Sequence, residues 1–189
     1  MAASHKNRWQ QTVTLRRGRA GLSQAMLVAF ALASGAASSG EEVLRNWFND
    51  PYFQVRDGVP TCPVPLGPFS TEAEMRYEGH HRAERGTRCW LAKQCSKPNS
   101  YLYDPEIATA VRLRFESTKV LRDANLWVTI QGRVVRIEGC VPSTYSDGTL
   151  ERLLRTVPDV ERVIVTVIRK HGAKPPYRTL APGQRRAEA

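Results

Sequence analysis

Residues 126–141, LWVTIQGRVVRIEGCV, alternate between two sets of side chains on either side of Gly132. A period of two is typical of β-strands, because successive side chains point to opposite faces of a sheet. Gly132-Arg133 predicts a tight turn in which the glycine supplies a positive φ. One face of this hairpin would hold Leu126, Val128, Ile130, Val135, Ile137, Gly139 and Val141. The other would hold Trp127, Thr129, Arg136, Glu138 and Cys140.

Helical periods lie on both sides of the hairpin. Asp104 can cap a helix that has Pro105 at its first position, and apolar residues then recur every four positions at Ile107, Val111 and Phe115. A second helix is expected at about 146–157, with an apolar stripe formed by Leu150, Leu153, Leu154 and Val157. The β-branched run VERVIVTVI at 160–168 predicts a third strand.

The order helix–strand–strand–helix–strand over residues 101–170 predicts an α+β domain. A hairpin would join the first two strands, and the second helix would cross over to the third strand in the preferred right-handed sense. We therefore expect a three-stranded mixed sheet with both helices on one face. The apolar face of the hairpin would pack against the helix stripes, together with Val163, Val165 and Val167 from the third strand. Ile164 and Ile168 compete with these valines for that face.

The stretch LWVTIQGRVVRIEGCVPSTYSDGTLERLLRTVPDVERVIVTVI resembles the BON domain, named for bacterial osmotically induced and nodulation proteins. Gly139 matches the glycine that ends the family's second strand, and Val160, Val163 and Val165 match its final strand. The resemblance covers residues of about 102–169 and implies the αββαβ fold. It also implies an exported envelope protein whose activity is binding, with anionic phospholipid as the ligand.

The first 33 residues predict export. They contain five basic residues and no acidic residue, and an apolar centre at 26–32 leads to Ala31-Leu32-Ala33, which fits a small-x-small cleavage site. This order is that of a secretory signal peptide, and the apolar run is shorter than the roughly 20 residues that span a bilayer. We expect a signal peptide at 1–33 and a periplasmic protein. An uncleaved anchor and a basic tail are the alternatives.

Four cysteines follow the leader, and an even number in an oxidising compartment predicts two disulfides. Cys89 and Cys95 are close enough in sequence for a short loop, which leaves Cys62 to pair with Cys140. A zinc site using His80 and His81, and free thiols, are weaker alternatives, since no CxxC spacing is present. We expect no metal and no cofactor.

An extension at 34–100 precedes the domain. Its part at 50–70 has five prolines and predicts an irregular segment, followed by a helix that starts with the capping-box pair Thr71 and Glu74 and ends at Gly86. A cysteine loop would occupy 87–100. We expect the Pro-rich segment to cover the face that holds Trp127 and Cys140, tied down by a Cys62–Cys140 disulfide that stabilises the fold by roughly 4–5 kcal/mol. The alternative is that Cys140 is a small buried hydrophobe.

Charge and motifs limit the function. The net charge is +10, but the leader carries +5 of it and residues 172–189, expected as a disordered basic tail at 171–189, carry +3. The folded part is nearly balanced, which disfavours a nucleic-acid binder. No catalytic motif is present, so we expect a non-enzymatic module that binds an anionic membrane surface or, alternatively, an envelope protein through Trp90, Trp127 or the Pro-rich segment. The candidate binding residues are Arg133, Arg136, Arg152, Arg155, Arg169, Lys170 and Trp127, and Gly132 and Gly139 are structural.

Overall fold

The computed structural model describes residues 41–58 and 61–187. Every feature described below belongs to one compact unit, which falls within residues 38–189. The predicted signal peptide at 1–33 lies outside the described residues. Among the described residues, no helix is long and apolar enough to cross a membrane.

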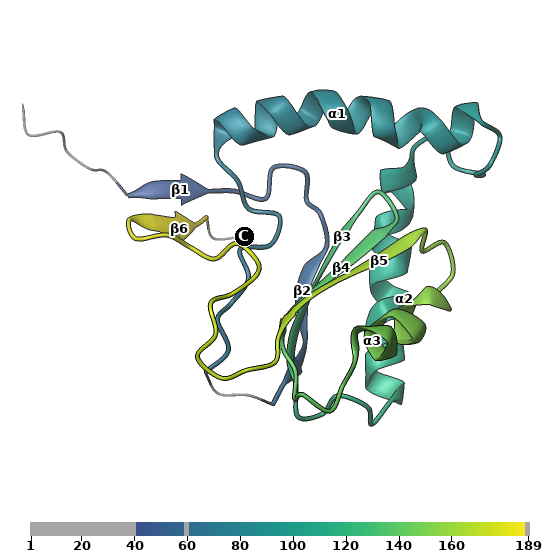
Figure 1. The fold of residues 1–189 in the computed structure, drawn as a ribbon. Helices are drawn as coiled ribbons and strands as arrows, with labels where there is room; N and C mark the ends of the chain where they lie inside the picture. The colour runs from purple at the N-terminus through teal and green to yellow at the C-terminus, as the bar shows by residue number, and fades with distance from the viewer. Residues whose placement is uncertain (1–40, 59–60, 188–189) are drawn as a thin grey trace, which may run out of the picture. The chain divides into compact units, whose positions relative to one another are not determined.

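The centre of the fold is a mixed sheet with the strand order β2-β3-β4-β5. Its strands are β2 (Tyr52–Asp57), β3 (Asn125–Gln131), β4 (Val134–Cys140) and β5 (Arg162–Ile168). β2–β3 and β3–β4 are antiparallel, whereas β4–β5 is parallel. The helices α2 (Asp104–Ser117) and α3 (Asp147–Arg155) lie on one face of this sheet (Figure 1).

The prediction of three strands was wrong, because β2 adds a fourth. β2 comes from the segment that the sequence predicted to be irregular, and it pairs Phe53 with Val128. The run YFQVRD contains no proline, so its N–H groups are available to a sheet, and the neighbouring prolines lie outside it. Phe53 is only 7 % exposed and joins the core, which explains why this strand stays on the sheet.

The core between the sheet and the two helices is the one that the periodicities predicted. Its fully buried members include Ile107, Val111, Phe115, Leu126, Val128, Ile130, Val135, Ile137, Leu150 and Leu154. On β5, Val163 is buried in this core and Val165 and Val167 are partly buried against it, so the predicted phase of the third strand is confirmed.

The hairpin turn is a two-residue turn in which both Gly132 and Arg133 have positive φ, at 60° and 70°. Positive φ at both positions is the geometry that matches the twist of a β-hairpin. Gly139 has a φ of 139°, and a Cβ atom there would lie 2.0 Å from the backbone oxygen of Asn125. Position 139 therefore admits only glycine.

Helix α1 (Glu72–Leu91) belongs to the extension and crosses one end of the sheet (Figure 1). The capping box of Thr71 and Glu74 is confirmed, with both reciprocal hydrogen bonds present. The helix does not end at Gly86 as predicted, because Gly86 is buried against the side chain of Asn99 and continues the helix. Cys89 and Trp90 therefore lie on the last turn of α1 rather than in a loop.

The C-terminal residues also differ from the prediction of a disordered tail. β6 (Gln184–Arg186) pairs in parallel with β1 (Glu42–Leu44). Tyr177 is buried, and its hydroxyl donates to the carbonyl of Pro63 at 2.8 Å. Charge alone suggested disorder here, but the apolar residues Pro175, Pro176 and Tyr177 give the segment a surface to pack.

Both disulfides have the expected pairing, Cys62–Cys140 and Cys89–Cys95, with Cα–Cα distances of 5.8 and 5.5 Å. The Cys62 bridge holds the Pro-rich segment against the sheet face opposite α2 and α3. We call residues 61–69 and 175–178 the roof. Burial raises the pKa of Tyr177 to about 12, so this hydroxyl stays protonated and keeps the two halves of the roof together.

Candidate anion-binding groove

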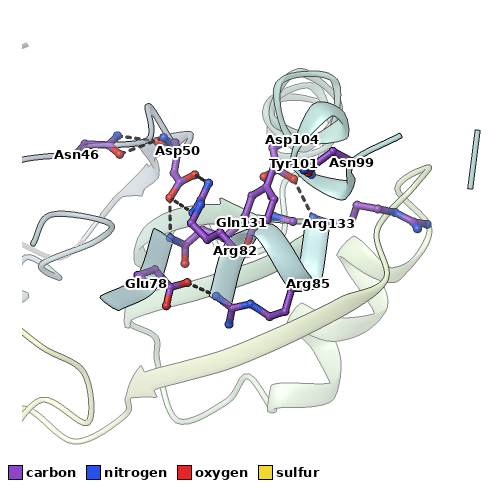
Figure 2. Close-up of polar contacts among 11 residues, drawn as sticks. Asn46, Asp50, Glu78, Arg82, Arg85, Asn99, Tyr101, Asp104, Gln131 and Arg133 are labelled. Carbon is purple, nitrogen blue, oxygen red and sulfur yellow. Dashed lines mark hydrogen bonds and ion pairs between the residues drawn. The ribbon is translucent and has the colours of Figure 1, made fainter. Parts of the chain in front are cut away.

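A buried ion pair fixes α1 to the end of the sheet. Arg82 donates to the carboxylate of Asp50 at 2.9 and 2.7 Å, and Gln131 of β3 donates to the same carboxylate at 2.6 Å (Figure 2). The guanidinium of Arg82 also lies 4.1 Å from the ring centre of Phe48 and 3.8 Å from that of Tyr101. One arginine thus joins α1, the loop before β2 and the end of β3.

A second carboxylate, Asp104, fixes the hairpin turn. It accepts hydrogen bonds from the backbone N–H of Gly132 at 2.6 Å and of Arg133 at 2.8 Å (Figure 2). The sequence suggested that Asp104 caps its own helix, but it is the first residue of α2 and Tyr103 holds the cap position. Burial raises the pKa of Asp104 to about 6, and the two backbone hydrogen bonds only partly offset that effect.

The face opposite α2 and α3 is covered unevenly. The roof is bonded to Cys140 at one end of β4, whereas α1 is tied to Gln131 at the opposite end of the hairpin. Between them, one row across the four strands consists of Tyr52, Thr129, Arg136 and Ile164. We call the hollow over this row the groove. It measures about 740 Å³ on the α1 side.

The groove continues under the roof into a second hollow of about 610 Å³. The two hollows share the lining residues Thr129, Gln131 and Arg136, and the second one also reaches Glu138 and Tyr177. Burial raises the pKa of Glu138, while the positive charge of nearby Arg136 lowers it. The shared residues make the two hollows one continuous feature of the sheet face.

Arginines dominate the α1 side of the groove. Five of its lining residues are arginines and two are glutamates: Arg85, Arg88, Arg133, Arg136, Arg162, Glu78 and Glu161. They come from three elements, α1, the β3–β4 hairpin and β5, with Glu161 directly before β5. Arg85 forms an ion pair with Glu78 (Figure 2), and Arg133 donates to the carbonyl of Asp159 at 2.8 Å. Within residues 41–58 and 61–187, Arg88, Arg136 and Arg162 have no ion-pair partner.

The floor of the groove contains an unusual hydroxyl. Thr129 is 3 % exposed, and its Oγ1 has no hydrogen-bond partner among the described residues. A buried hydroxyl without a partner is unfavourable by about 1–3 kcal/mol. Arg136 is its direct neighbour on β4. The groove therefore combines excess positive charge with an unused donor.

The candidate residues from the sequence do not form a single surface. Arg133 and Arg136 line the groove. Trp127 is 8 % exposed and lies on the covered side of the sheet. The four others lie on α3 or after β5 and are exposed, namely Arg152, Arg155, Arg169 and Lys170. Two of these are paired, Arg155 with Glu151 and Arg169 with Asp147.

Three groove arginines were missed from the sequence, Arg85, Arg88 and Arg162. Arg85 and Arg88 are three residues apart and share a face of a helix, but this signal was lost because the predicted helix stopped at Gly86. Arg162 is at the start of β5, next to Val134 in the sheet register. Only the tertiary structure brings these three elements together.

The end of α1 forms a second notable feature, which we call the tip, residues 89–95. Trp90 is 46 % exposed and Leu91 is 76 % exposed. The Cys89–Cys95 disulfide closes the chain across this turn, and Lys93 adopts a positive φ of 55° within it. In Figure 1 this end of α1 extends beyond the sheet. In the sequence, Arg88 precedes these two apolar residues and Lys93 follows them.

The elements α2, β3, β4, α3 and β5 define a small α+β domain of the helix–strand–strand–helix–strand class, with β2, α1 and the roof added to it. Residues 103–169 match the family model of the BON domain, so this part of the chain is a BON domain. No curated protein and no solved structure matches the chain.

Proposed function

We propose that this protein is an exported, non-catalytic component of the cell envelope that binds anionic phospholipid at a membrane surface. BON domains are associated with envelope and membrane-related proteins. The observation that carries the proposal is the tip, where two large apolar side chains are exposed between two cations. The basic, apolar and small-residue order of the first 33 residues supports a periplasmic location.

The tip has the composition of an interfacial membrane anchor. Tryptophan prefers the boundary between headgroups and acyl chains, because its ring is apolar and its N–H is polar. Full burial of a side chain such as Leu91 contributes about 1.5–3 kcal/mol, and each cation near an anionic surface adds about 1 kcal/mol. The disulfide supports the apolar pair on a closed turn, which reduces the conformational entropy lost on binding.

Vesicle flotation tests this function. The exported protein, with its disulfides formed, is mixed with vesicles of phosphatidylcholine alone or with added phosphatidylglycerol. We expect flotation only with the anionic vesicles, and weaker flotation as salt is raised. The double change Trp90→Ala and Leu91→Ala should remove most of it, whereas Leu113→Ala, an exposed leucine on α2, should not.

A second candidate is a protein-interaction module, which the same exposed Trp90 favours because tryptophan is enriched at interaction hot spots. This function requires no lipid. Absence of flotation with anionic vesicles at low salt would reject the membrane proposal and leave this candidate. Flotation that is unchanged in the tip variant would show that binding does not use the tip.

A further inference from the structure

We propose that the groove is a binding site for the phosphate group of a phosphomonoester or phosphodiester. This inference does not depend on membrane contact by Trp90 and Leu91, because neither side chain lines the groove and the inference is tested with soluble compounds. It rests on three observations: the unpaired arginines, the partnerless hydroxyl at the floor, and the rigid frame that holds both.

The arginines supply the charge and the geometry. Arg88, Arg136 and Arg162 come from α1, β4 and β5 and border one hollow. None of the three forms a close ion pair with a carboxylate within the described part of the chain, although the charge of Glu138 acts on Arg136 at longer range. A guanidinium presents paired N–H donors that match two oxygens of a phosphate, and several of them together favour an anion with more than one free oxygen.

Thr129 is the independent sign of a missing ligand. Its hydroxyl is buried, unpartnered among the described residues, and belongs to the lining of both hollows. Buried hydroxyls are nearly always hydrogen-bonded in folded proteins. An oxygen of a bound phosphate, held by Arg136 on the neighbouring strand, would accept from Thr129.

The frame around the site is rigid. Thr129 and Arg136 are on the two central strands, which are paired along their whole length. The Arg82–Asp50–Gln131 network fixes α1, and with it Arg88, relative to the end of β3. Donors held in place by a scaffold lose little entropy when an anion binds. The hollow of about 740 Å³ is larger than a phosphate and leaves room for its organic substituent.

Two sources of this phosphate are possible, a soluble metabolite and a lipid headgroup. Isothermal titration of the exported protein with inorganic phosphate, glycerol 3-phosphate and glycerophosphoglycerol would test the soluble source. Flotation with phosphatidylglycerol vesicles would test the lipid source. Saturable binding of one soluble compound per chain supports the site and identifies a free ligand. Flotation that depends on Arg136 and Thr129, without soluble binding, supports the site and identifies a headgroup.

Three variants test the residues. Arg136→Ala and Arg162→Ala should each weaken binding about tenfold, the effect of losing one charge-assisted contact. Thr129→Val replaces the hydroxyl with a methyl group of similar size, and should weaken binding severalfold while the protein remains folded by circular dichroism. Arg122→Ala, an exposed arginine outside the groove, is the matched control and should not change binding.

The proposal is overturned if none of the three soluble compounds binds saturably and flotation is also insensitive to the groove variants. It is equally overturned if binding occurs but Thr129→Val and Arg136→Ala leave it unchanged. Flotation that is lost with the Trp90 and Leu91 changes but kept in the groove variants would retain the membrane proposal and reject this one. The two proposals therefore fail separately.

Discussion

Arg82 and Asp50 form a bidentate ion pair with N–O distances of 2.9 and 2.7 Å, and their side chains are 10 % and 4 % exposed. The pair connects α1 to a loop 32 residues earlier in the chain. Because both charges are buried away from water, each charge is stabilised by the other instead of by hydration. The position of α1 over the groove therefore depends on this single contact more than on any apolar face of the helix.

Removal of Arg82 should be strongly destabilising. Arg82→Ala leaves Asp50 buried without its partner and removes the stacking on Phe48 and Tyr101, so we expect a loss of about 3–5 kcal/mol in the free energy of unfolding. Urea denaturation measures it. Arg76→Ala is the control on the same helix, because the Arg76–Glu72 pair is 74 % and 58 % exposed and should contribute less than about 1 kcal/mol. Equal losses for the two variants would contradict the assigned role of Arg82.

The two disulfides should contribute unequally. Cys62–Cys140 closes a sequence separation of 78 residues and Cys89–Cys95 one of 6. The chain-entropy relation gives about 4.5 kcal/mol for the long loop and about 2 kcal/mol for the short one. We expect the double change to serine at 62 and 140 to lower stability more than that at 89 and 95. It should also red-shift tryptophan fluorescence, as Trp127 loses its cover; a larger loss from the short bridge would contradict this account.

Asp104 should make stability depend on pH. Its pKa rises from 3.8 to about 6 on folding, so the folded state binds its proton more tightly than the unfolded state. The contribution of Asp104 to the free energy of unfolding is therefore highest below pH 4. It falls as the pH rises through 6, by up to about 3 kcal/mol. Asp104→Asn does not titrate. We expect the stability of the unaltered protein relative to this variant to fall between pH 4 and pH 7; a rising difference would show that the hydrogen bonds from Gly132 and Arg133 outweigh burial.

The glycines of the hairpin should differ in their tolerance of a side chain. Gly139→Ala places a Cβ 2.0 Å from the backbone oxygen of Asn125 at a φ of 139°, and no side-chain movement can relieve a backbone contact. We expect a loss of about 3 kcal/mol or more. Gly132→Ala keeps a φ of 60°, which alanine adopts at a cost of about 1 kcal/mol. Thermal unfolding of both variants measures the difference, and similar melting temperatures would reject it.

The local patterns of residues 104–168 were sufficient to predict the domain, because each element has a clear period and its neighbours in space are near in sequence. Leu126, Val128 and Ile130 show this on β3. The bridge between Cys62 and Cys140 could be predicted because the short Cys89–Cys95 loop left only one remaining pair. The recognition of a BON domain depended on the same patterns and is confirmed by the match at residues 103–169.

Features built from distant segments were not predictable in this way. β2 pairs with β3 about 70 residues later in the chain, and its flanking prolines hid the strand. Gly86 was predicted to end the helix, as glycines often do. The structure gives another reason for this glycine: the side chain of Asn99 packs against it and leaves no room for a Cβ atom. The groove needs Arg88, Arg136 and Arg162 from three elements, and no linear spacing relates them. For Trp127 the sequence led to two expectations that conflict with each other. The Pro-rich segment was expected to cover this side chain, and the same side chain was expected to contact a membrane or a partner.

The parallel pairing of β1 with β6 determines how the protein responds to mechanical tension. The chain enters β1 at one end of this pair and leaves β6 at the other, with Glu42 N–H bonded to Gly183 O and Ala187 N–H bonded to Leu44 O, both at 2.7 Å. A pull between residues 41 and 187 would slide the strands along each other and load these bonds in shear, together with the Glu41–Arg185 ion pair. The pair would act as a clamp that must yield before the force reaches the roof or the sheet.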